Sequence, residues 1–92
     1  MTSIDRAIIA EGLAVGMQPD RGDAIPGFAD PLGARWLRFR AACARVERET
    51  TTDPELRAYL HCSACGADAE ASARERSLDR MAERARERRN AA

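Results

Sequence analysis

The apolar residues between positions 32 and 46 restrict the fold of this 92-residue chain more than any other feature does. They follow one another at gaps of four, three, four and three residues: Leu32, Trp36, Phe39, Cys43 and Val46. This spacing puts all five side chains on one narrow stripe of an α-helix, which has 3.6 residues per turn. Since the stripe contains the single Trp and one of the two Phe residues, we expect it to supply much of the core.

Two Asp-Pro dipeptides mark the starts of helices. Asp30-Pro31 precedes the apolar stripe, and Asp53-Pro54 follows it. Aspartate can cap the free backbone N–H groups of a helix, and proline fits the first helical position, where an N–H would have no partner. The sequence therefore predicts one helix from Pro31 to about Glu49 and another beginning at Pro54.

The N-terminal residues predict a further helix that is covered on two sides. Ser3 can cap it, and Gly16 can end it just after Val15. Its apolar residues fall on two faces: Ile4, Ala7, Ile8 and Val15 on one, Ile9 and Leu13 on the other. Residues 18–31 follow with three prolines and two glycines, so we expect an irregular linker there.

Two interpretations of the C-terminal third are open. In the first, Gly66 ends the third helix and Asp68 caps a fourth, which continues to about Arg89. In the second, one long helix passes through Gly66, because glycine costs a helix interior only about 1 kcal/mol relative to alanine. A heptad stripe interrupted only by Arg74 supports the second: Leu60, Ala64, Ala67, Ala71, Leu78, Met81 and Ala85.

Together these elements predict an all-α fold and a single domain over residues 1–92. We expect a small three- or four-helix bundle with an irregular Pro/Gly linker at about 18–31 and a long charged C-terminal helix. The expected central residues are Leu32, Trp36, Phe39, Cys43, Val46, Leu56, Leu60 and Leu78. A homodimer is also expected, since the Ala-rich last helix offers more packing surface than one short chain covers.

The charge distribution argues against a nucleic-acid or membrane protein. Fifteen basic and fifteen acidic residues give a net charge of zero, so the whole chain has no long-range field. No apolar run approaches the ~18 residues of a membrane span, and Glu11 interrupts the best candidate, residues 7–15. That run also lacks the features of a signal peptide, so we expect a cytoplasmic protein with reduced cysteines.

The basic residues are all arginines, and several could dock a partner. Arg38, Arg45 and Arg48 are expected on the outer face of the second helix, opposite its apolar stripe. Arg80 and Arg84 lie in the charged last helix. Because a guanidinium binds a carboxylate through two parallel hydrogen bonds, we predict that these five residues contact a partner.

A Cys-x-x-Cys-Gly motif at Cys62, Cys65 and Gly66 is the one pattern with chemical content. Such a turn can direct two thiolates at one Zn²⁺, and His61 and Cys43 could complete four ligands. The ligand spacing is unusual, since adjacent residues of a helix project about 100° apart. The alternative is that Cys43 is a small core residue and that His61 lies on the surface beside half-buried cysteines.

These observations favour a non-enzymatic helical module that binds another protein or complex as a regulator, accessory subunit or inhibitor. The alternative is a zinc-stabilised nucleic-acid-binding regulator that uses Cys62 and Cys65. A third interpretation, a thiol enzyme, is less favoured, because the cysteines are expected near a helix C-terminus, where the helix dipole raises a thiol pKa.

Overall fold

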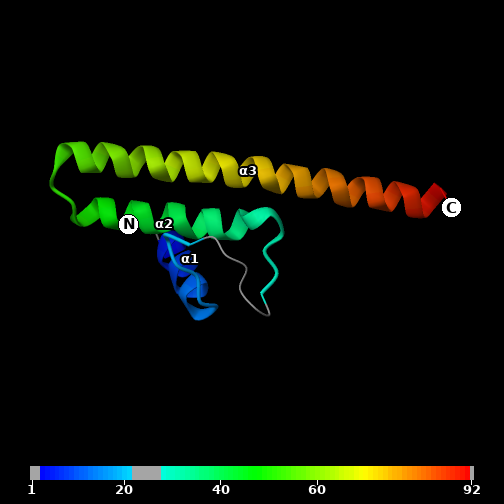
Figure 1. Cartoon of the computed structure of the whole chain (residues 1–92), viewed down its shortest axis with the longest axis horizontal. Coiled ribbons are helices and arrows are strands. Elements are labelled where there is room, and N and C mark those ends of the chain that lie inside the picture. Colours follow the sequence, from blue (N-terminus) through cyan, green and yellow to red (C-terminus); the bar gives the residue numbers. More distant parts are fainter. Residues whose placement is uncertain (1–2, 22–27, 92) are drawn as a thin grey trace.

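The computed structural model describes residues 3–21 and 28–91, and this part of the chain is all-α, as predicted. It contains three α-helices, α1 (Ser3–Ala14), α2 (Ala34–Thr50) and α3 (Pro54–Ala91). One short 3-10 helix, η1 (Pro31–Gly33), comes directly before α2. α2 and α3 run antiparallel side by side, and α1 crosses α2 on the side away from α3 (Figure 1). The fold is thus a helical hairpin of α2 and α3, with α1 packed against α2.

The turn between α2 and α3 forms as the Asp53-Pro54 signal predicted. α3 begins at Pro54, and the Asp53 carboxylate accepts a hydrogen bond from the Glu55 backbone N–H at 3.3 Å. The Arg57 guanidinium donates hydrogen bonds to the carbonyl oxygens of Arg48 and Thr51, at 2.7 and 3.1 Å. These carbonyls lie in the last turn of α2, where most carbonyls lack an intrahelical partner, although the Thr51 N–H also donates to the Arg48 carbonyl at 3.3 Å. One side chain therefore closes the hairpin.

The start of α2 differs from the prediction by one turn. Residues 31–33 form η1, and the backbone of Leu32 is left-handed, with φ of +60°, before α2 begins at Ala34. Asp30 still caps the helix, because its carboxylate accepts hydrogen bonds from the backbone N–H groups of Arg35 (2.8 Å) and Trp36 (2.9 Å). The left-handed break removes Leu32 from the helical stripe, so its predicted core position is wrong and its side chain is 49% exposed.

The core between α2 and α3 is a seam of small side chains. Its buried members are Leu37, Ala41, Ala44, Leu60, Ala64, Ala67 and Ala71. Five of these seven are alanines, so the two helix backbones can approach closely. Leu60 is buried as predicted, whereas Leu56 is exposed and Leu78 is only half-buried.

The predicted stripe of α2 only partly faces the interior. Phe39 is buried beneath α1, but Trp36, Cys43 and Val46 are half-buried, because the alanine seam takes the side that faces α3. Trp36 packs at the edge of the seam. The helix is thus covered on two sides, by α3 over the alanine seam and by α1 over Phe39.

α1 ends with the glycine cap predicted at Gly16. The Gly16 N–H donates to the Leu13 carbonyl at 3.1 Å, the Met17 N–H donates to the Gly12 carbonyl at 2.9 Å, and Gly16 has φ of +91°. This is the paired hydrogen bonding of a Schellman cap. Gly12 lies directly over Phe39, and a methyl group there would overlap the aromatic ring. Ser3 begins the helix, although its capping side chain lies outside the part described.

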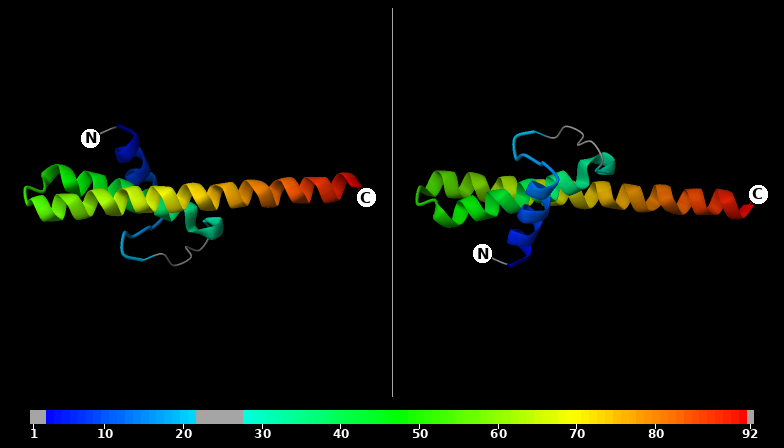
Figure 2. Two further views of the ribbon diagram at one scale, coloured as in Figure 1. Left: turned by 90° about the horizontal axis from the view of Figure 1, so that it is seen from above. Right: turned by 90° about the horizontal axis from the view of Figure 1, so that it is seen from below.

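α3 is one helix of 38 residues that passes through the exposed Gly66, as the heptad stripe indicated. The alternative, a fourth helix capped by Asp68, is wrong. α3 extends well beyond the N-terminal end of α2, which gives the molecule a length of 59 Å (Figure 2). Since α1 packs on α2 alone, the predicted bundle is not confirmed. Residues 22–27, which are part of the predicted linker, lie outside the described residues.

Candidate functional site

Two arginines predicted on the outer face of α2 point toward α3 instead. Arg38 and Arg45 both bind the Asp68 carboxylate, at 3.0 and 2.6 Å respectively. Arg38 also binds Glu75 at 3.0 Å, and Arg45 binds Asp5 of α1 at 2.8 Å. Because the two arginines are seven residues apart, they share the edge of α2 that faces α3. The expectation that they form a solvated outer face is therefore wrong.

These contacts tie all three helices together. The hydrogen bond to the buried Asp5 carboxylate is the main cause that raises the pKa of Arg45, and the hydrogen bond to Glu75 does the same for Arg38. Both guanidinium groups are engaged within the chain, so a partner would have to displace carboxylates to bind them. Arg48 is half-buried, and its Nε has no hydrogen-bond partner within the described part of the chain.

α3 divides into two parts at Glu75, the last residue on it that binds a side chain of α2. We call residues 54–75 the paired segment and residues 76–91 the arm. Just before this boundary, the Arg74 guanidinium donates a hydrogen bond to the Leu32 carbonyl at 2.6 Å. That contact fixes the turn before α2 against α3, and the arm extends beyond the N-terminal end of α2.

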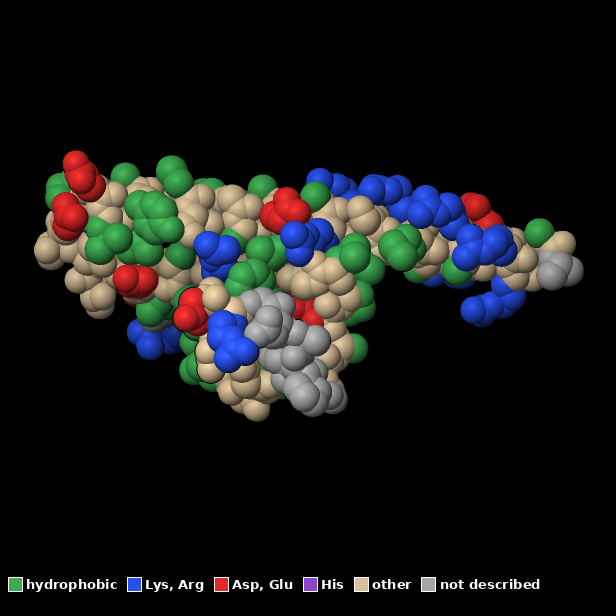
Figure 3. Space-filling view, viewed as in Figure 1, with side chains coloured by type: hydrophobic (Ala, Val, Ile, Leu, Met, Phe, Trp, Pro, Cys, Tyr) green, Lys and Arg blue, Asp and Glu red, His purple; other side chains and the backbone are tan. Residues whose placement is uncertain are grey.

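The arm carries the two remaining arginines predicted to contact a partner. Arg80 and Arg84 are both exposed, and in the described residues neither forms an ion pair. The arm contains six arginines and three acidic residues, and arginines gather along its outer side (Figure 3). Its net charge of +3 contrasts with the neutral whole chain.

An uncovered apolar strip runs along the arm in line with the packed seam. The heptad positions that are buried as Ala64, Ala67 and Ala71 in the paired segment continue as Leu78, Met81 and Ala85. Met81 is 50% exposed, while the other two are half-buried. The same spacing thus has a partner helix over one part of α3 and none over the other.

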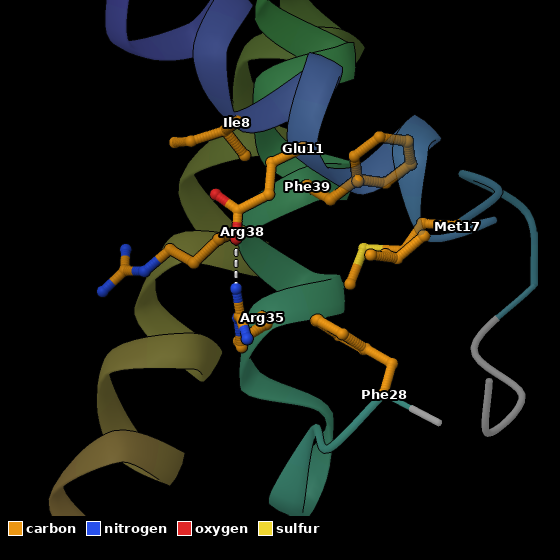
Figure 4. Close-up of a pocket in the computed structure, with 9 residues that line it drawn as sticks. Ile8, Glu11, Met17, Phe28, Arg35, Arg38 and Phe39 are labelled. Atoms are coloured by element: carbon orange, nitrogen blue, oxygen red, sulfur yellow. Dashed lines mark hydrogen bonds and ion pairs between the residues drawn. The ribbon is translucent and has the colours of Figure 1, made fainter. Parts of the chain in front are cut away.

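A pocket of about 320 Å³ lies between α1, α2 and Phe28 (Figure 4). Its walls are mainly apolar, with Met17, Phe28 and Phe39 around it, and the ion pair of Glu11 with Arg35 spans its rim. The Arg35 guanidinium also lies 4.5 Å from the centre of the Phe28 ring. Sequence reasoning missed this pocket, because its residues come from three segments and share no motif.

The four predicted zinc ligands are not brought together. Cys62 and Cys65 lie on the exposed side of an uninterrupted helix, so the expected turn at Gly66 is absent. The Cys65 sulfur lies 3.7 Å from the His61 Nε2, one helical turn away. Across residues 3–21 and 28–91, no three His, Cys, Asp or Glu side chains are placed to hold a metal ion, so Cys43 does not complete a set.

Cys43 behaves as the small, half-buried side chain of the alternative interpretation. Burial raises the pKa of its thiol, and the nearby Glu47 carboxylate raises it further. A thiol with a raised pKa is less nucleophilic at neutral pH, because less thiolate is present. All three cysteines are free thiols.

Comparisons with known proteins give no relative for this arrangement. No protein-family model matches the chain, and neither a curated protein nor a solved structure does. Of the helices described, none combines the length and apolar character that crossing a membrane requires. Among the described surfaces, the arm has the geometry best suited to binding another helix.

Proposed function

We propose that this chain is a non-enzymatic, helical protein–protein interaction module whose arm is the docking surface. The observation that carries the proposal is the seam of α3, which α2 covers up to the boundary at Glu75 and which continues uncovered through Leu78, Met81 and Ala85. A helix with an exposed apolar strip at this spacing is suited to pack against another helix or a groove. The hairpin then serves to hold the arm in a fixed direction.

The charges beside the strip suit a protein partner better than a nucleic acid. Arg80 and Arg84 are available for carboxylates of the partner, whereas Arg38 and Arg45 already bind acidic residues of the chain. Acidic residues alternate with the arginines of the arm, which would repel a phosphate backbone. An elongated protein with a docking surface at one end could act as a regulator, accessory subunit or inhibitor of a larger complex. We place this activity in the cytoplasm, where free thiols persist.

Affinity capture from the native lysate tests this function, with and without nuclease. The variants are Met81→Glu, which puts a charge on the strip, and Arg76→Gln, which makes the same change of −1 in net charge on the opposite side of the arm. We expect partners that survive nuclease, bind the Arg76→Gln control and are lost by Met81→Glu. Loss of every partner on nuclease treatment would favour nucleic acid, and equal capture by both variants would remove the arm from the docking surface.

A further inference from the structure

The pocket between α1, α2 and Phe28 is separate from the arm, since its lining residues lie between positions 8 and 39. Its volume of about 320 Å³ is at the lower end of the range for small-molecule sites, roughly 300–1,000 Å³. We propose that this pocket binds a small aromatic carboxylate, with the ring between the two phenylalanines and the carboxylate on Arg35. This binding function goes beyond the docking function of the arm and does not depend on it.

The walls of the pocket suit a flat, apolar ligand. Phe39 lines one side and is buried, and Phe28 lines the opposite side, with Met17 between them (Figure 4). The backbone of α1 lies directly on the Phe39 ring at Gly12, which fixes that wall. Aromatic rings pack well against one another and against a thioether sulfur. An aromatic ring is therefore the ligand body that these walls favour.

The charged side chains of the pocket are Glu11, Arg35 and Arg38. Arg38 is bound to Asp68 and Glu75 of α3, and its guanidinium points away from the phenylalanines (Figure 4). Glu11 and Arg35 bind each other at the rim. The charge of the ligand therefore depends on which member of this pair it can replace.

Arg35 is the fixed member of the pair, and Glu11 is the replaceable one. The Arg35 guanidinium lies 4.5 Å from the centre of the Phe28 ring, and the Arg35 backbone N–H donates to the Asp30 carboxylate at 2.8 Å. The Glu11 side chain is 62% exposed and, among the described residues, accepts its only hydrogen bond from Arg35 Nη2. Such an exposed ion pair contributes little, because water solvates both charges. A ligand carboxylate can thus take the place of Glu11, which turns into solvent.

The Arg35 guanidinium has further donors for the entering anion. Within the described part of the chain, its Nε and Nη1 donate to no acceptor. A carboxylate can bind a guanidinium through two parallel hydrogen bonds, which is stronger than the single bond present. A cationic ligand has no comparable site, since it would have to displace Arg35 from the Phe28 ring to reach Glu11. The geometry therefore favours an anion.

Isothermal titration calorimetry of the full chain with naphthoate tests this proposal. Naphthamide and naphthylmethylammonium are the matched probes, because they carry the same ring system with no charge and with a positive charge. We expect naphthoate to bind about tenfold more tightly than naphthamide, and the ammonium probe to bind most weakly. Equal binding of all three, or preference for the cation, would overturn the assignment of an anion. Lack of binding by any probe at millimolar concentration would overturn the site itself.

The two rim residues should respond with opposite signs. Arg35→Gln should weaken naphthoate about tenfold and leave naphthamide nearly unchanged, because only the charged probe uses the guanidinium. Glu11→Gln should tighten naphthoate by a few-fold, since the competing carboxylate is lost. Arg40→Gln is the control: it removes the same charge from an exposed position of α2 that does not line the pocket. If Arg35→Gln affects naphthoate no more than this control does, Arg35 does not bind the carboxylate.

A larger side chain inside the pocket tests the location. Val15 lines the cavity and is half-buried, so Val15→Phe should fill the space and abolish binding of every probe. Met81→Glu, in the arm, should leave naphthoate binding unchanged. Circular dichroism reports whether each variant keeps its helices. Glu11 and Arg35 are exposed, so their variants test the charge even if Val15→Phe disturbs α1. A folded Val15→Phe chain that binds naphthoate normally would place the ligand elsewhere and overturn the proposal.

Discussion

The paired segment and the arm are two parts of one helix with the same heptad spacing, yet only one of them has a neighbour. The paired segment presents Ala64, Ala67 and Ala71, all buried against α2. The arm presents Leu78 and Met81, which are larger and less buried. The comparison shows that heptad spacing defines a seam but does not say how far along the helix a partner reaches.

Charge placement decides where pairing within the chain stops. Asp68 and Glu75 are the carboxylates of α3 that bind the arginines of α2: Asp68 binds both Arg38 and Arg45, and Glu75 binds Arg38 alone. Beyond Glu75, α2 has already turned away through Gly33 and Leu32, both with positive φ. The boundary of the paired segment is therefore set by a backbone break in one helix and by the last carboxylate that its arginines reach on the other.

The largest expected difference between the two parts concerns a charge placed on the seam. Ala71→Glu should lower the free energy of unfolding by about 3 kcal/mol or more, because Ala71 is fully buried and a carboxylate there has no partner. Ala85→Glu is the matched change in the arm and should cost less than about 0.5 kcal/mol in the monomer. Urea unfolding at low protein concentration measures both, and similar costs would contradict the division of α3 at Glu75.

A smaller difference should appear when an acidic residue is removed from each part. Asp68→Ala should lower the free energy of unfolding by about 1–2 kcal/mol, because Arg38 and Arg45 both lose a partly buried carboxylate. Asp79→Ala, its counterpart in the arm, should change the monomer by less than about 0.5 kcal/mol. High salt should narrow the gap between the two variants, and an equal effect would mean that the ion pairs do not support the hairpin.

Gly66 tests whether the paired segment is an unbroken helix. A methyl group at Gly66 would meet nothing within 4 Å, so Gly66→Ala should raise the free energy of unfolding by about 0.5–1 kcal/mol through helix propensity alone. Gly12→Ala is the contrasting change, since its methyl group overlaps Phe39 and should destabilise the contact of α1 with α2. Thermal and urea unfolding measure both. Destabilisation by Gly66→Ala would indicate a bend in α3 that requires glycine.

The smallest effect concerns the outer face of the paired segment, which carries Cys62 and Cys65. Both are exposed, so they should be alkylated faster than Cys43, whose thiol is half-buried with a raised pKa. Above the ordinary thiol pKa of about 9.0, Cys43 ionises in the unfolded chain before it ionises in the folded chain, so the free energy of unfolding falls as the pH rises. Mass spectrometry of timed alkylation resolves the three sites. Faster reaction at Cys43 would contradict the placement of its side chain.

Local signals in the sequence predicted the helices and most of their ends. The Asp53-Pro54 start, the Asp30 cap and the Gly16 cap depend on residues within a few positions of one another, so sequence alone specifies them. The heptad stripe through Gly66 likewise indicated one long helix. The start of α2 was misplaced by one turn, because a left-handed backbone at Leu32 has no signature in the sequence.

The candidate site was predictable only where no tertiary contact intervened. Arg80 and Arg84 lie exposed on the arm, as a charged terminal helix suggests. Arg38 and Arg45 were assigned to the wrong surface, since carboxylates 23 to 40 residues away in sequence decide which way they point. The apolar pocket gave no signal at all, because three separate segments form it.

By itself, the sequence determined that this chain is helical and where most of its helices begin and end, because caps and apolar spacing act within one or two turns. The tertiary structure decided which face of each helix is buried, which arginines are bound within the chain, and how far α2 reaches along α3. Those outcomes depend on whether two backbones can approach across small side chains and on whether opposite charges meet. Distances in space set both conditions, and distances along the chain do not reveal them.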